Sequence, residues 1–471
     1  MMPPVLRRVD LPRAAQAAYW ICLVILFVLL RAKSSGMVFE DENIPLKISQ
    51  AMTARGSLDP NWRFADLSAS LSYDQYNFYL YNVVAHFVIK VAEWLDRSGL
   101  GELRHANLLF QLLALAFAVD ALRRIGAGLL VLAAAGALIT FAPGMVQDAG
   151  MARPESLLYL FSALFVWTLT LPLAERRRLL LAGVVLGAGI AVKLTFASLA
   201  VMLPFLMPVR GRPVTALAAS AAIFALGAAL GFAAGAPYAI IHFDVFRHGL
   251  AMLAAQYSGA HPPHSLPEYG VGSQVWWLGR YFIELYGLAP IVALASPFVL
   301  KGPARNWAFA LGGAWVVLFV YFASKAVFFE RNFAHGLVPL LLAAALGIGA
   351  PKRTSLQLTA AVLVALPMAY WSVQIARVLR DPERAERFEA EHALAPAQRV
   401  SFDTIYAGEL PARCERVAVR NTNDLWSAAY LAKLEQNNFT PIALYRSPFG
   451  SLVTSTLHTY FEGDLHYFRC P

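Results

Sequence analysis

Eleven long apolar runs are the feature that most limits how this sequence can fold. A helix needs about 20 apolar residues to cross a bilayer's hydrocarbon core of about 30 Å. Runs that approach or reach this length begin near Ala18, Asn107, Ala127, Leu157, Leu179, Thr195, Val214, Val275, Trp307, Phe333 and Leu356. The sequence therefore predicts an all-α, polytopic membrane protein.

Composition excludes a soluble enzyme. Of the 471 residues, 58% are hydrophobic and 15% are charged, against about 45–50% and about 25% in soluble domains. The formal net charge of +9 comes from small basic clusters between the apolar runs. Because these clusters form no extended basic stripe, we interpret them as topology signals and predict no nucleic-acid partner.

A twelfth run, residues 78–95, has two interpretations. Its polar residues recur every three or four positions and so follow one helical face: Asn82, His86, Lys90, Glu93 and Arg97. Such a stripe is typical of a helix lying in the membrane interface. The alternative is a spanning helix whose polar stripe faces the interior of the bundle.

The positive-inside rule favours the interfacial alternative. If 78–95 does not span, the basic clusters fall on the same side as the N-terminus. They are Arg7, Arg8, Arg13, Arg123, Arg124, Arg176, Arg177, Arg178, Arg210, Arg212, Lys301, Arg305, Lys352 and Arg353. We therefore predict eleven spans, with the N-terminus in the cytoplasm and the C-terminus outside.

The first apolar run is expected to be a signal anchor. It continues into residues 31–33 without a small-residue cleavage site. Cys22 lies inside this run, and Cys414 and Cys470 lie in the predicted outer tail. An oxidising periplasm permits a disulfide between the two tail cysteines, and two unpaired thiols are the alternative.

Three outer segments are too long to be simple connections: 34–104, 242–274 and 379–471. We assign residues 1–378 to a transmembrane domain and 379–471 to a small outer α/β domain. In this tail a charged helical stretch is expected over 381–392, strands over 416–419 and 441–445, and a helix over 424–436. The tail contains no glycine-rich nucleotide loop.

Acidic residues follow the first span directly. Asp41 and Glu42 stand in a run of three carboxylates, in which one holds its proton more tightly and is suited to act as a base. A solvated acidic cap on a helix end is the alternative. Ile44, Ile48 and Met52 share one helical face, which predicts a surface helix from the carboxylates to Gly56.

This segment resembles the first outer loop of the GT-C superfamily of membrane glycosyltransferases. The branch that it resembles is similar to glycosyltransferase family 39 and includes protein O-mannosyltransferases and the lipid A aminoarabinose transferase. Further motifs follow in the family's order: Arg-Pro-Glu at 153–155, a glycine-rich span with a Lys-Leu-Thr turn at 183–195, and Glu-Arg-Asn at 330–332 before Leu-Val-Pro at 337–339. Residues 76–79 lack the proline of the family's second outer helix, which leaves the acceptor unspecified.

The resemblance implies a GT-C fold and a single inverting displacement. Asp41 would be the base, with Glu42 orienting the acceptor or Asp41. Lys193, Arg331 and, with lower rank, Arg153 would bind the donor phosphate. The predicted topology places these cations at the outer boundary, where a cytoplasmic nucleotide sugar is out of reach, so the expected donor is a sugar on polyprenyl phosphate.

Each cation also has a structural interpretation. Lys193 could extend its ammonium to the interface. Arg331 could pair with Glu330, and Arg153 with Glu155 or Asp148, which would fix the bundle.

The second outer loop supplies substrate-contact candidates: Tyr257, His261 and His264. Two histidines across two prolines make a poor zinc site, so no metal and no cofactor is predicted. The expected partners are the lipid-linked donor, the bilayer, and a lipid, glycan or protein acceptor. The predicted location is a bacterial inner membrane, with the site facing the periplasm.

Two functions from other classes remain open at this stage. A transporter or flippase of lipid-linked sugars should show repeated halves and charges near the midplane. Here the halves do not repeat and the charges lie at one boundary. A non-catalytic envelope-assembly subunit would not need Asp41 or Glu42.

Overall fold

The computed structural model describes residues 12–32, 42–60, 79–207, 211–258, 271–326, 329–381, 383–411, 413–420, 424–447 and 463–471. The helices are α1 Arg13–Arg31, α2 Asn43–Arg55, α3 Tyr79–Trp94, α4 Gly99–Arg124, α5 Leu129–Thr140, α6 Pro143–Ala149, α7 Glu155–Leu169, α8 Glu175–Val192, η3 Leu194–Met202, α9 Leu203–Leu206, α10 Val214–Gly235, α11 Pro237–Ile241, α12 Phe243–Ser258, α13 Val271–Tyr286, α14 Ala289–Val299, α15 Gly302–Ala323, η4 Glu330–Phe333, α16 Ala334–Ile348, α17 Thr354–Arg380, α18 Arg384–Glu391, α19 Phe402–Ala407 and α20 Asp424–Gln436. The strands are β1 Gln398–Arg399, β2 Arg416–Arg420, β3 Thr440–Tyr445 and β4 Leu465–Arg469. The predicted class, a helical membrane protein with a small C-terminal α/β unit, is confirmed.

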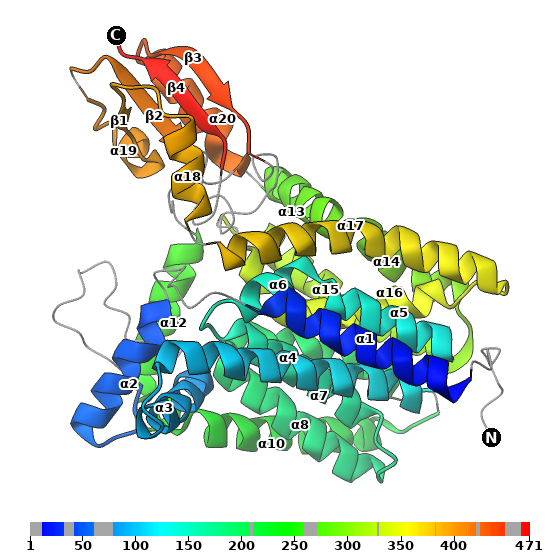
Figure 1. Cartoon of the computed structure of the whole chain (residues 1–471). Helices are drawn as coiled ribbons and strands as arrows, with labels where there is room; N and C mark the ends of the chain where they lie inside the picture. The colour runs from blue at the N-terminus through cyan, green and yellow to red at the C-terminus, as the bar shows by residue number, and fades with distance from the viewer. Residues whose placement is uncertain are drawn as a thin grey trace.

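Long helices form one bundle around α16. In Figure 1 they run across the view, with the start of α1 at the right, α2, α3 and α12 at the left, and the C-terminal strands above. Every residue of α16 except Gly347 is buried, and α16 packs against α5, α7, α14 and α15. Its N-terminal end is therefore surrounded by protein rather than by lipid.

Each predicted apolar run is helical. By length and composition, six described helices could cross a membrane, and two bent pairs raise the number to eight. The pairs are α5 with α6, bent by 51°, and α13 with α14, bent by 95°. Pro143 forces the first break because the residue before a proline is driven out of the helical region, and Ala142 has ψ 112°. The predicted total of eleven spans stays a prediction.

Glycines bring α8 and α10 into direct backbone contact. A Cβ at Gly187 would lie 2.0 Å from the carbonyl oxygen of Ala228, and one at Gly231 would lie 2.1 Å from that of Val184. Small residues spaced four apart allow this approach between helices in a membrane, where packing rather than water drives association. The close contact fixes the axis of α8 and so the position at which it ends.

Polar contacts show which helix ends lie together. Arg212, before α10, forms two hydrogen bonds of 2.6 Å to Glu175 at the start of α8. At the end of α4, Asp120 accepts hydrogen bonds from Arg123, Arg124 and Trp167. These basic ends lie opposite α2 and α3, at the right of Figure 1. The structure thus groups clusters that the positive-inside rule assigns to one side.

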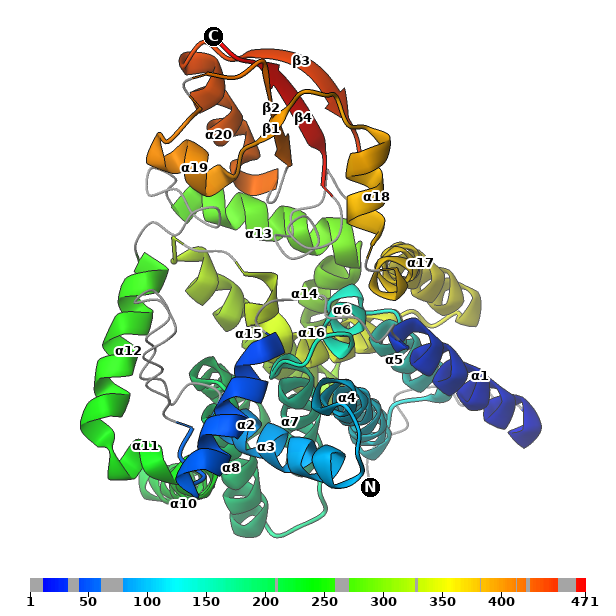
Figure 2. The same ribbon diagram turned by 60° about the vertical axis from the view of Figure 1, so that its left-hand side comes forward.

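Helix α3 lies across the direction of the bundle. Figure 1 shows α4 from the side and α3 nearly end-on, and Figure 2 shows the reverse. His86 is buried against α2, where its Nδ1 lies 3.0 Å from Ser49 Oγ, while Phe87, Val91 and Trp94 are exposed. This arrangement supports the interfacial interpretation. The apolar face of α3 is exposed, and His86 of the polar stripe packs against α2.

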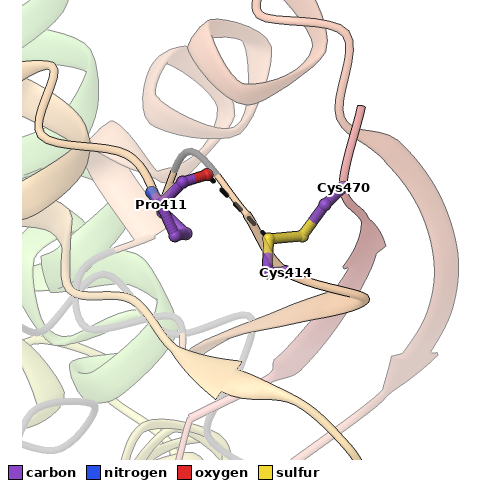
Figure 3. The surroundings of a disulfide bond; sticks show 3 residues. All are labelled: Pro411, Cys414 and Cys470. Carbon is purple, nitrogen blue, oxygen red and sulfur yellow. Dashed lines mark hydrogen bonds between the residues drawn. A yellow bond between two sulfur atoms is a disulfide. The ribbon is translucent and has the colours of Figure 1, made fainter.

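The C-terminal domain has a four-stranded sheet in the order β1-β2-β4-β3. β1 is parallel to β2, and β4 is antiparallel to both of its neighbours. The predicted strands and the helix 424–436 are present, while β1 and β4 were not predicted. A disulfide joins Cys414 to Cys470 (Figure 3) and attaches the chain after β4 to the chain before β2. Figure 2 shows α13 between this domain and the bundle.

The topology can be tested by labelling single cysteines from outside intact cells. In a Cys22→Ala background, cysteines at the exposed positions Glu93 and Glu435 should react with an impermeant maleimide. Cysteines at the exposed positions Arg177 and Lys352 should react only after the membrane is opened. Labelling of position 177 in intact cells would show that the eleven-span topology is wrong.

The disulfide joins two cysteines that lie 56 positions apart in the sequence, and so closes a long loop of the chain. On a chain-entropy estimate, a Cys414→Ser/Cys470→Ser variant should lose about 4 kcal/mol of free energy of unfolding in the C-terminal domain. Thermal denaturation should show the loss. A mass spectrum of unreduced, alkylated protein should show neither thiol modified, and modification of both would contradict the bridge.

Candidate active site

Lys193 stands at a sharp break between two helices. It ends α8 with an extended backbone, φ −154° and ψ 125°, and η3 begins at the next residue. Its side chain is buried, at 7% exposure, and Nζ donates a hydrogen bond of 2.9 Å to Asn332 Oδ1. The ammonium therefore points into the protein toward η4 and does not extend to solvent.

Asn332 links Lys193 to helix α12, in the second of the predicted outer segments. Asn332 is 1% exposed, and its Nδ2 donates to the Tyr257 hydroxyl at 3.1 Å. Tyr257 lies near the end of α12, where its carbonyl accepts from Ala326 N at 3.1 Å. Arg331, the neighbour of Asn332, places its guanidinium 4.5 Å from the Phe329 ring centroid. The structure thus brings together three predicted site residues: Lys193, Arg331 and Tyr257.

Glu42 is held by a buried ion pair. Its carboxylate is fully buried and accepts from Arg104 at 3.0 Å and 2.8 Å, in a two-bond arrangement that suits a planar guanidinium. The same carboxylate accepts from Ala152 N at 2.8 Å. Glu42 therefore joins the N-terminus of α2 to α4 and to the segment that carries Arg153.

Arg153 pairs with Glu155, which is one of the two partners that its structural interpretation proposed. Its Nε lies 3.5 Å from Glu155 Oε2, and both side chains are buried. Asn107 Nδ2 donates to the Arg153 carbonyl at 3.4 Å, which fixes the backbone of the same turn. Arg153 thus has a clear role in holding the segment between α6 and α7.

Charges on these segments share one electrostatic environment. Lys193 is attracted by Glu155 and Asp148 and repelled by Arg331 and Arg153. Asp148 accepts from the Tyr159 hydroxyl at 2.6 Å and is also close enough to interact with Glu330. In a poorly hydrated site such charges act on one another far more strongly than in water. Charges of both signs therefore surround the Lys193 ammonium.

The remaining predicted site residues, Asp41, His261 and His264, lie outside the described residues. Glu42, the next residue in the sequence after Asp41, is the first described residue of its segment. Within the described part of the chain, no group of three His, Cys, Asp or Glu side chains could hold a metal ion.

Sequence reasoning missed Arg104 and Asn332 as parts of this site. Arg104 is the partner of Glu42 and stands in the first turns of α4. The only local signal for it was a cation at the start of an apolar helix, which is costly unless it is paired. Asn332 belongs to the Glu-Arg-Asn motif at 330–332, and its position next to Arg331 was its only signal.

Comparison with solved structures identifies the architecture. ArnT from Cupriavidus metallidurans bound to undecaprenyl phosphate superposes with a TM-score of 0.57 at 14% identity, over 97% of this chain and 98% of ArnT. The apo state of the same protein gives a TM-score of 0.55 at 14% identity, over 92% and 96% of the two chains. The chain has the GT-C fold.

The GT-C likeness extends through the C-terminal domain, because it covers almost the whole of both chains. The resemblance inferred from short motifs is thereby confirmed at the level of the fold. No protein-family model and no curated protein matches the chain.

The buried pair of Glu42 and Arg104 can be tested through stability. Arg104→Met leaves a carboxylate buried without its partner, so the free energy of unfolding in detergent should fall by about 3–5 kcal/mol. Glu42→Gln/Arg104→Met removes both charges and should recover part of the loss. The matched control is Arg97→Met, whose ion pair with Glu102 is exposed and should contribute at most about 1 kcal/mol. Equal losses for Arg104→Met and Arg97→Met would contradict a structural role for the buried pair.

Proposed function

We propose that this chain is a membrane glycosyltransferase that transfers a sugar from a polyprenyl-phosphate donor to an acceptor at the periplasmic face. The observation that carries the proposal is the fold shared with a protein crystallised with undecaprenyl phosphate. The convergence of Lys193, Arg331 and Tyr257 around the buried Asn332 supports it.

The site suits a lipid phosphate for physical reasons. A phosphate that leaves in the transition state gains negative charge, and cations preorganised in a water-poor site stabilise it strongly. Lys193 is held in place by Asn332, so it would need little reorganisation when the phosphate arrives. In the proposed orientation, these cations lie near the outer lipid headgroups, where the polyprenyl phosphate has its charged end.

The proposed reaction is one inverting displacement. Asp41 removes the proton from the acceptor hydroxyl, and the acceptor oxygen forms a bond to the anomeric carbon. The bond from that carbon to the phosphate oxygen breaks, and its electron pair stays on the polyprenyl phosphate. Lys193 and Arg331 stabilise this leaving group. The step needs one base and no covalent intermediate.

Glu42 is proposed to position Asp41 rather than to react. Its oxygens accept from Arg104 and Ala152, so they are already engaged. This anchor fixes the chain on one side of Asp41 and connects it to the segment of Arg153. The sequence left two roles open for Glu42, orienting the acceptor or orienting Asp41, and we propose the second because the carboxylate oxygens already have protein partners.

Asp41→Asn tests the base. The substitution keeps the size of the side chain and removes its ability to accept a proton, so transfer should fall by about 100-fold or more. The matched control is Asp96→Asn, at an exposed position with φ 55° that tolerates asparagine well. Transfer is measured with purified protein, a panel of radiolabelled polyprenyl-phosphate sugars and envelope acceptors. Transfer by Asp41→Asn at the parental rate would rule out Asp41 as the base and favour a transporter or a non-catalytic envelope-assembly subunit.

Lys193→Ala tests the phosphate site, and it should impair transfer in a different way from Asp41→Asn. The donor phosphate loses a counter-charge in a poorly hydrated site, so the donor KM should rise and kcat should fall. Lys90→Ala, which removes a lysine paired with Glu93 on α3, is the control and should leave both constants unchanged. An unchanged donor KM in Lys193→Ala would place the phosphate elsewhere.

A further inference from the structure

A histidine from the central helix lies directly against the turn that carries Lys193. His335, at the start of α16, is fully buried, and its Nε2 lies 3.0 Å from the Thr195 carbonyl oxygen. A carbonyl oxygen can only accept, so Nε2 carries the proton and donates. This hydrogen bond reaches across 140 positions in the sequence to the second residue after Lys193.

The turn itself is tightly enclosed. Lys193 N donates to the Gly189 carbonyl, and Phe196 N donates to the Lys193 carbonyl, each at 2.9 Å. A Cβ at Gly189 would lie 2.3 Å from the Phe196 ring, so this ring fills the space beside the glycine. The centroid of the Phe196 ring also lies 5.8 Å from that of the His335 ring. The turn is therefore enclosed between α8 and His335.

Two side chains from one short segment hold this turn at two different points. Asn332 accepts from the Lys193 ammonium, and His335, three positions later, donates to the backbone of the turn. The His335 backbone is in turn fixed to α7, because Ser162 Oγ donates to its carbonyl at 2.9 Å. Asn332 thus restrains the charged end of Lys193, and His335 restrains the main chain from which Lys193 extends.

We propose that His335 is a positioning residue that sets the location of the Lys193 ammonium for the donor phosphate. The inference rests on the proposed function, since that function makes Lys193 a phosphate ligand. His335 acts through the turn and does not touch the substrate. Loss of its hydrogen bond would let residues 193–196 shift, and the cation would leave the place that the phosphate occupies.

The chemistry of the contact indicates how to test it. The bond needs an N–H donor at the position of Nε2, which a neutral imidazole ring provides. The other ring nitrogen, Nδ1, is buried and has no hydrogen-bond partner among the described residues. A glutamine amide can place an N–H at nearly the same distance from the backbone. His335→Gln should therefore preserve the restraint, whereas His335→Phe keeps a ring in the core and removes the donor.

The experiment measures the affinity of the full-length protein in detergent for undecaprenyl phosphate, together with the donor KM and the acceptor KM. His335→Phe should weaken the affinity and raise the donor KM by about 10-fold, as expected for one buried hydrogen bond, and should leave the acceptor KM unchanged. His335→Gln should stay within about threefold of the parent. In a Lys193→Ala background, His335→Phe should cause no further loss, because the two act as one unit. His248→Phe, at an exposed position on α12, is the matched control.

A purely structural role would give another pattern. His335→Gln and His335→Phe would then lower the yield of folded protein without changing the affinity of the folded fraction, and this result would overturn the proposal. So would additive losses in the Lys193→Ala background.

A second measurement separates this inference from the proposed function. Reductive methylation of Lys193, followed by mass spectrometry, reports how well the ammonium is held and needs no substrate. His335→Phe should accelerate the methylation, and His335→Gln should not. If the parent neither binds undecaprenyl phosphate nor transfers sugar, the proposed function fails, and the methylation rates alone decide whether His335 positions Lys193. Equal rates in all variants would overturn the positioning role.

Discussion

Charges buried among apolar helices are the constraint on which the rest of this structure depends. A buried charge costs several kcal/mol unless a partner and hydrogen bonds compensate for it. The chain meets this requirement with contacts between distant segments, above all the pair of Glu42 with Arg104 and the bond from Lys193 to Asn332. These contacts determine where α2, the break after α8 and the start of α16 lie relative to the rest of the bundle.

The apolar part of the fold prepares the positions of these charges. Direct contact between the glycines of α8 and the backbone of α10 fixes the end of α8, and Pro143 breaks the span between α5 and α6. Because both breaks occur at the end of the bundle that carries α2 and α3, the polar segments meet there (Figure 1). The basic helix ends lie at the opposite end, where Arg212 pairs with Glu175. The bundle thus has two charged ends, to which we assign different roles: a predicted topology signal at one and the proposed reaction site at the other.

Local patterns in the sequence were sufficient for the parts of the fold that depend on local physics. The helix from Asn43 to Arg55 ends at Gly56, with φ 60°, and buries Ile48 and Met52, as its apolar spacing predicted. Strand β1 has only two residues, and β4 begins 20 positions after β3 ends, so the pairing of either strand with β2 gave no local signal. Asn332 and His335 could not be connected to the turn of Lys193 from spacing, since about 140 residues separate the partners. The motifs indicated which residues to examine, and only the fold shows which of them act together.

In the proposed function, the anionic head of a polyprenyl phosphate binds at the turn of Lys193, at the end of the bundle that carries α2 and α3. The most direct test is photo-crosslinking with an undecaprenyl phosphate that carries a diazirine beside the phosphate, followed by mass mapping of the labelled peptides. We expect labelling of the peptides that contain 189–196 and 329–336, and competition by unlabelled undecaprenyl phosphate. Labelling confined to the basic end, in the peptides around Arg176–Arg178 and Arg212, would contradict this expectation.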